Sequence, residues 1–209
     1  PLLYIGSVSI IVVVTVSTLL FRLNDKLQTR DQASTYVTAV DIEDSTERME
    51  ALGKITDSKS KFMAEALYMQ GHAAIESEDY ETAKVALTTL REKHPDFEFT
   101  PDGVEGLGTI HELSGNYDEA IAVYKDIQAT WPESFAARRQ PFNIGRCHEE
   151  NDNPAEALKA FQEQLQTFPE SNVALHAQQK IDQLESANPA LAQAPEIEGP
   201  APVAPSDAL

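Results

Sequence analysis

Two pairs of residues, His111-Glu112 and His148-Glu149, begin like the zinc-protease motif. In that motif two histidines four residues apart on a helix bind the metal, and the glutamate acts as a base. Neither pair has a second histidine four positions after the first. Because the metal needs both imidazoles on one helical face, packing between helices explains these histidines better. We therefore expect no metal and no cofactor.

Cys147 beside His148 suggests a nucleophile and its base. Neighbours on a helix do not face each other, however, so we expect Cys147 to be an unreactive core residue. Gly106-Leu107-Gly108 resembles a dinucleotide-binding loop, but no strand precedes it. A single cysteine also excludes an internal disulfide and a multi-cysteine metal site. The sequence thus predicts a protein that is not an enzyme.

The charge of the chain limits the class of partner. Among 209 residues, 34 are acidic and 16 are basic, which gives a net charge of -18. Nucleic-acid binding requires lysine and arginine to neutralise phosphates, so we expect no nucleic-acid partner. An acidic surface favours basic or neutral protein partners instead.

The elements that position these residues are set by an internal repeat with a spacing of 37 residues. Each copy has a glycine, an alanine twelve residues later and a proline after twelve more: Gly71, Ala83 and Pro95; Gly108, Ala120 and Pro132; Gly145, Ala157 and Pro169. Self-similarity at a fixed period is typical of solenoids. Small residues fit where two helices cross, and proline ends the second helix. We therefore expect each copy to be a helical hairpin.

The repeat resembles the tetratricopeptide repeat (TPR) family, whose helix-turn-helix unit has 34 residues. The second copy matches best, with Gly108, the turn Gly115-Asn116-Tyr117, Ala120, Tyr124 and Pro132. The resemblance implies an all-α solenoid of three repeats and a capping helix over residues 64–187. The cap places Ala174, Ala177, Ile181 and Leu184 on one face.

The extra three residues per unit predict longer loops between repeats. Thr100 then serves as an N-cap with Pro101 in the first helical turn. Pro141 lies early in the third repeat, where we expect it to delay or kink the first helix.

In TPR arrays the first helix of each repeat lines a concave groove, and this implies a set of candidate partner-binding residues. They are Tyr68, His72, Ile75, Glu105, Thr109, Glu112, Arg139, Phe142, Arg146 and Glu149. The set mixes aromatic, basic and acidic side chains, as a peptide-recognition groove does. The alternative is an ordinary solvated helix face, which carries a similar mixture.

The two ends of the chain differ from the repeat region. Residues 2–21 carry no charge and would form a helix of roughly 30 Å, enough to span a bilayer. We expect residues 1–22 to be an uncleaved transmembrane anchor; a signal peptide and a buried core helix are the alternatives. Residues 23–63 are expected to form a spacer and a degenerate helical cap, with helices at 32–40 and 45–55. Residues 188–209 contain five prolines and no lysine or arginine, which indicates a flexible Pro/Ala-rich tail.

This organisation resembles that of single-anchor bacterial envelope TPR proteins of the ancillary-translocon type. It implies a membrane-tethered scaffold or adaptor that docks a segment of a membrane-complex subunit or a secreted chain. The alternative is a stoichiometric structural accessory subunit of a large membrane complex. The resemblance places the TPR domain outside the inner membrane, whereas Arg22, Lys26 and Arg30 after the anchor argue for the cytoplasmic side. Because the sequence starts at Pro1, we expect a further N-terminal flank.

Overall fold

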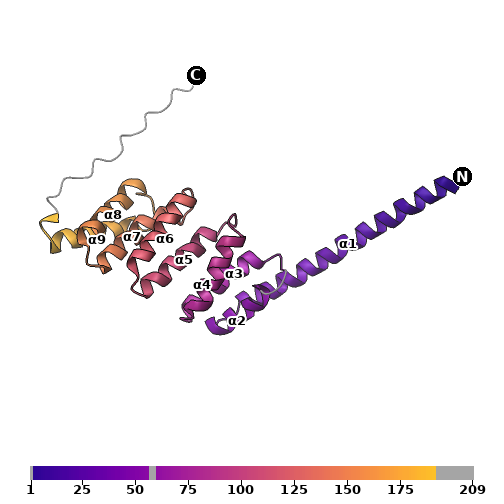
Figure 1. The fold of residues 1–209 in the computed structure, drawn as a ribbon, viewed down its shortest axis with the longest axis horizontal. Coiled ribbons are helices and arrows are strands. Elements are labelled where there is room, and N and C mark those ends of the chain that lie inside the picture. Colours follow the sequence, from indigo (N-terminus) through magenta and orange to yellow (C-terminus); the bar gives the residue numbers. More distant parts are fainter. Residues whose placement is uncertain (1, 57–59, 192–209) are drawn as a thin grey trace, which may run out of the picture. The chain divides into compact units, whose positions relative to one another are not determined.

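The computed structural model describes residues 2–56 and 60–191, with side chains from Val14 onward. Every regular element in these ranges is helical, and the helices form an all-α repeat solenoid (Figure 1). The chain divides into two compact units, Pro1–Phe97 and Glu98–Leu209.

Unit 1 contains the helices α1 (Leu2–Val40), α2 (Ser45–Thr56), α3 (Met63–Glu76) and α4 (Tyr80–Lys93). The helices predicted at 32–40 and 45–55 are confirmed as the end of α1 and most of α2. The predicted spacer before residue 32 is also helical, because α1 is continuous. Ala39, Leu52, Ile55 and Ala66 bury a core that joins α1, α2 and α3.

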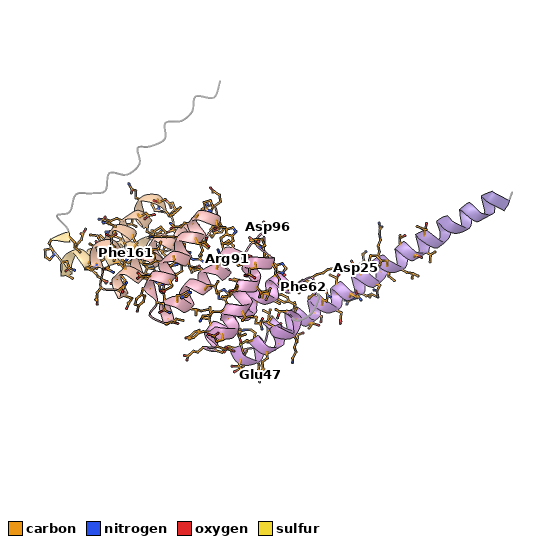
Figure 2. The ribbon with its side chains drawn as sticks, viewed as in Figure 1. Asp25, Glu47, Phe62, Arg91, Asp96 and Phe161 are labelled. Atoms are coloured by element: carbon orange, nitrogen blue, oxygen red, sulfur yellow. The ribbon has the colours of Figure 1, made fainter. Side chains whose placement is uncertain are left out.

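One face of α1 holds the segment before α3. Lys61 Nζ lies 2.7 Å from Asp25 Oδ1 and 2.9 Å from Thr29 Oγ1. The rings of Tyr36 and Phe62 stack with centroids 5.6 Å apart. Asp25 and Phe62 are labelled in Figure 2. The part of α1 from Asp25 onward therefore belongs to the fold of unit 1.

Among the described residues, no helix combines the length and the apolar character that a membrane span requires. The predicted anchor falls largely on residues 1–13, whose side chains lie outside the described residues. The described side chains of its last part, from Val14 to Phe21, are exposed. The anchor stays a prediction.

Unit 2 contains α5 (Thr100–Leu113), α6 (Tyr117–Thr130), the short 3₁₀ helix η1 (Ala137–Arg139), α7 (Gln140–Glu150), α8 (Pro154–Thr167) and α9 (Ala174–Ala187). One core cluster centres on the buried Tyr124 and Ile127 and extends to Cys147. A second joins Phe161 on α8 to Ala177, Ile181 and Leu184 on α9. Three of the four residues of the predicted capping face of α9 are thus buried, and Ala174 is half-buried.

The three repeat glycines lie directly against the residue sixteen positions later. A Cβ on Gly108 would lie 2.7 Å from Tyr124 Cζ and closer still to Cε1. On Gly145 it would lie 2.7 Å from Phe161 Cδ1, and on Gly71 it would overlap the side chain of Leu87. Real Cβ atoms do not approach so closely. The predicted role of these glycines as packing residues at helix crossings is confirmed.

The turn inside each hairpin also repeats at 37 residues, with positive φ at Glu78 (62°), Gly115 (72°) and Asp152 (54°). In the second turn, the N–H of Gly115 donates to Glu112 O and that of Asn116 to His111 O. The equivalent pairs form in the other two turns, so each first helix ends in a Schellman motif. That motif needs a left-handed residue, which glycine adopts without a Cβ penalty.

We expect opposite effects of glycine exchange at equivalent turn positions. Glu78→Gly should stabilise unit 1 by up to about 1 kcal/mol, because relief of roughly 1–2 kcal/mol of left-handed strain exceeds the added entropy of the unfolded chain. Gly115→Ala should destabilise unit 2 by about 1–2 kcal/mol for the same reason. Thermal unfolding measures both. Ser77→Gly is the control, since Ser77 has φ -88°. Stabilisation by all three exchanges would contradict the assignment.

The structure tests three further predictions made from the sequence. The N-cap at Thr100 is wrong: Phe99 caps α5 without a side-chain bond, and Thr100 is fully buried. Pro141 does delay its helix, since η1 comes first and α7 begins only at Gln140. The first tail residues are described, and Leu191 packs on the core cluster of α8 and α9. The rest of the tail, residues 192–209, lies outside the described residues.

Candidate partner-binding face

Three of the predicted groove residues lie on α3 in unit 1. Tyr68, His72 and Ile75 are each half-buried. The rings of Tyr68 and His72 meet edge to face with centroids 4.5 Å apart. Much of this aromatic surface therefore packs within its own helix.

The other seven lie on α5, η1 and α7 in unit 2, and the structure places five of them, all but Thr109 and Phe142, in ion pairs. Arg139 Nε donates to both carboxylate oxygens of Glu105 at 2.8 Å. Its Nη2 lies 2.6 Å from Asp102 Oδ1, and Asn143 Nδ2 donates to Glu105 at 2.7 Å. The bonds to Glu105 raise the pKa of Arg139 above its ordinary value. Arg139 and Asn143 thus link η1 and α7 to α5.

About two turns further along α5, Glu112 joins three elements. Its carboxylate accepts from Arg146 Nη2 at 2.7 and 2.8 Å, and from the hydroxyl of Tyr124 at 2.7 Å. Tyr124 is fully buried, and burial raises its pKa above the ordinary value. The Cys147 thiol lies 3.3 Å from the same carboxylate. Glu112 therefore fastens α5 to α6 and α7.

A third ion pair joins α7 to α9, with Lys180 Nζ 2.7 Å from Glu149 Oε2. Phe142 packs on the core cluster of α8 and α9. Its ring centroid lies 5.5 Å from that of Phe161 and 6.0 Å from the Arg146 guanidinium carbon. We call the Glu105–Arg139, Glu112–Arg146 and Glu149–Lys180 pairs the ion-pair ladder.

A pocket of about 230 Å³ opens beside the ladder. It is lined by Glu112, Leu113, Tyr117, Arg146, Glu149, Glu150 and Lys180. Leu113 is 57% exposed and Glu150 is exposed, although neighbouring carboxylates are paired. We call the surface around Leu113, Tyr117 and Glu150 the α5–α7 face. It offers a partner an apolar and an acidic contact.

Comparisons with known proteins agree with the repeat geometry. Models named "Tetratricopeptide repeat" match residues 68–135 and residues 142–171. Tetratricopeptide repeats occupy these residues. The TPR register places each repeat glycine against the residue sixteen positions on, as the structure does.

Solved structures of MamA proteins share the fold. A MamA protein aligns with a TM-score of 0.54 and 23% identity, covering 69% of this chain and 75% of that chain. The MamA RS-1 ArsTM double mutant aligns with a TM-score of 0.54 and 16% identity, covering 78% of this chain and 97% of that chain. MamA AMB-1 aligns with a TM-score of 0.51 and 14% identity, covering 83% of this chain and 96% of that chain. No curated protein matches the chain. At these identities the likeness shows the fold alone.

The TPR register alone did not find several residues that shape the α5–α7 face. Asp102, Asn143 and Lys180 complete the ion-pair network, and Leu113 and Tyr117 line the pocket. One signal was present, because Glu105 and Glu112 precede Arg139 and Arg146 by the same 34 residues. A regular acid-to-base spacing across one repeat indicates pairing between successive first helices.

A second pocket in unit 2 lies among the loops rather than on the first helices. It measures about 610 Å³, and Phe135, Arg138 and Phe168 are among its lining residues. Phe135 is 80% exposed, and the Arg138 guanidinium carbon lies 5.4 Å from its ring centroid. The larger volume does not make it the better site, because Arg139 is the one predicted groove residue in its lining and is already paired with Glu105.

The histidines and the cysteine behave as packing residues. Cys147 is 1% exposed, and burial raises the pKa of its thiol well above the ordinary value, so it is a poor nucleophile. His148 Nδ1 is buried without a hydrogen-bond partner among the described residues. In the described ranges, no group of His, Cys, Asp or Glu side chains is placed to hold a metal ion.

His148 predicts a dependence of stability on pH. Burial lowers its pKa in the folded state below the ordinary value. The unfolded chain therefore binds this proton more readily, and stability should fall as pH drops below about 6.5, the unfolded pKa. Thermal unfolding at pH 7.5 and 5.5 measures the loss, and His148→Gln should reduce it. An equal loss in the variant would show that other groups are responsible.

Proposed function

We propose that the chain is a membrane-tethered, non-enzymatic scaffold whose α5–α7 face docks a segment of a protein partner. The observation that carries the proposal is the exposed Leu113 next to Glu150, on a face otherwise closed by ion pairs. Binding energy concentrates in a few contacts where an apolar anchor enters a pocket. The TPR fold supports a role in protein–protein interaction.

The chemistry of the pocket favours a basic and apolar segment. Glu112 and Glu149 are neutralised by Arg146 and Lys180, so Glu150 is the carboxylate left for a partner. A net charge of -18 adds long-range attraction for cations. We propose a segment in which a lysine or arginine lies close to a leucine-like side chain.

The tether rests on the uncharged run of residues 2–21. Because α1 is one helix from Leu2 to Val40, it would connect a bilayer directly to the core of unit 1. Tethering raises the effective concentration of the face near membrane partners, so a modest affinity suffices. We propose the inner membrane of a bacterial envelope as the location.

We further propose that the TPR domain lies on the extracytoplasmic side. This rests on the resemblance in organisation to envelope TPR proteins. The basic residues after residue 21 favour the opposite orientation. Ser206→Cys adds a thiol in the segment predicted to be a tail, while Cys147 is buried. Labelling by a membrane-impermeant reagent in cells stripped of their outer barrier supports this orientation. Labelling only after lysis reverses it.

The alternative is a stoichiometric accessory subunit of a large membrane assembly. Extraction of the tagged full chain in mild detergent separates the two roles, because a permanent subunit keeps its partners through extensive washing. A transient scaffold loses them within the wash.

The proposed face is tested by the same purification with a variant. Leu113→Asp should lower partner recovery about tenfold, which corresponds to roughly 1.4 kcal/mol. Val85→Asp is the matched control, because Val85 is 68% exposed but lies on α4. Circular dichroism confirms that both variants fold. Equal recovery with both would overturn the proposed face.

A further inference from the structure

Among the exposed apolar side chains of α1, one row lies on the face that unit 1 does not use, whereas Val14 and Phe21 lie on the other side of the helix. Val16, Leu20, Leu23, Leu27 and Val37 are between 49% and 61% exposed. Successive members are four, three, four and ten residues apart, which keeps them on the a and d positions of a heptad. We call this row the α1 seam. Arg30 and Ser34 occupy the two positions between Leu27 and Val37.

The seam lies opposite the face that packs within unit 1. The contacts of α1 with Lys61 and Phe62 come from Asp25, Thr29, Gln32 and Tyr36, and Ala39 packs in the core with α2 and α3. These positions are offset from the seam by about half a turn of the helix. The packing of unit 1 therefore leaves the seam open while it holds the helix in place.

The charges beside the seam are complementary to those of the same helix in another copy. In a parallel coiled coil, a g residue of one helix pairs with the e residue five positions later on the other. The heptad places Lys26 at g and Asp31 at e. Both are exposed, and neither side chain has an ion-pair partner among the described residues. Each helix thus supplies one lysine and one aspartate, so that a symmetric dimer would contain two such ion pairs.

We propose that two copies of this chain associate through a parallel, in-register coiled coil of α1 along the α1 seam. The proposal goes beyond the scaffold function and does not require that residues 2–21 lie in a bilayer. Arg30 at a d position weakens the seam, although its aliphatic stem packs alongside apolar neighbours. A dimer presents two α5–α7 faces, so that partners with two docking segments bind with avidity.

Cysteine cross-linking of the full chain in membranes tests the parallel, in-register arrangement of the two α1 helices. Residues at a and d positions meet their own counterparts across the axis, within the distance that a disulfide spans. Leu23→Cys and Leu27→Cys should each form disulfide-linked dimers with copper phenanthroline. Gln28→Cys, one residue on and facing outward, should stay at the background of the wild-type chain. Failure at either seam position, or equal linking at Gln28→Cys, overturns the parallel register.

The dissociation constant of the dimer, measured for the full chain in detergent, tests how strongly the seam and its ion pairs stabilise association. Lys26→Asp should raise the dimer dissociation constant about three- to tenfold, because two ion pairs become repulsive. Adding Asp31→Lys should restore it, which a merely structural effect would not do. Leu27→Asp should raise it at least about tenfold, with Gln28→Asp as control. A monomeric wild-type chain, a Leu27→Asp chain that dimerises normally, or no rescue by the double exchange overturns the proposal.

Discussion

Gly108→Leu is expected to lower the melting temperature of unit 2 by about 10–20 °C. The added side chain must occupy space held by Tyr124, which is fully buried and fixed by its hydrogen bond to Glu112. Overpacking of a tight core costs about 1–3 kcal/mol, and this site lies at the upper end because a Cβ alone already overlaps the ring. For a domain of this size, 1 kcal/mol corresponds to roughly 4–8 °C. Thermal unfolding followed by circular dichroism measures the shift.

Gly53→Ala provides the control with the opposite sign. Its Cβ would meet only Nε2 of Gln70, at 2.9 Å, the mobile end of a flexible side chain. Alanine is favoured over glycine in a helix interior by about 1 kcal/mol, so this exchange should leave stability unchanged or raise it. Destabilisation of equal size at both sites would show that the contact with Tyr124 is not the cause.

Arg139→Met is expected to destabilise unit 2 by about 2–3 kcal/mol, somewhat less than the roughly 3–5 kcal/mol for breaking a fully buried pair. Arg139 is the cation between Glu105 and Asp102, whose side chains are only 15% and 23% exposed. Without it, two neighbouring carboxylates are left in a partly desolvated site. Denaturant unfolding measures the loss.

Arg138→Met is the matched control, one residue away. Arg138 is exposed and stacks on Phe135, and it has no ion-pair partner in the part of the chain that the structure describes. Exposed substitutions of this kind change stability by less than about 0.5 kcal/mol. Equal effects of the two exchanges would refute the structural role of the ladder.

The repeat could be predicted from the sequence because it depends on local sterics. Gly108 and Gly145 are required where the rings of Tyr124 and Phe161 lie against the first helix, and Gly115 marks the left-handed turn. The N-cap of α5 lies at Phe99, one residue before the predicted Thr100, because the side chain of that threonine is buried instead of capping the helix. Burial of a polar side chain depends on tertiary packing, which local rules for capping do not include.

The candidate site could be predicted only in part, for a related reason. The register identified Glu112 and Arg146 as groove residues, but it could not show that they neutralise each other. Pairing depends on side-chain reach between helices 34 residues apart in sequence. The structure therefore moves the candidate contacts from the paired charges to Leu113, Tyr117 and Glu150.

The claim that a protein partner docks on the α5–α7 face is tested most directly by site-specific photo-cross-linking in intact cells. A photoreactive amino acid replaces Leu113 in the full chain, with Val85 and Phe135 as comparison sites, since both are exposed apolar positions away from the face. We predict a discrete adduct to a protein partner at Leu113, with the linked peptide containing lysine or arginine close to an apolar residue. An adduct at Phe135 or Val85 with none at Leu113 would contradict the account.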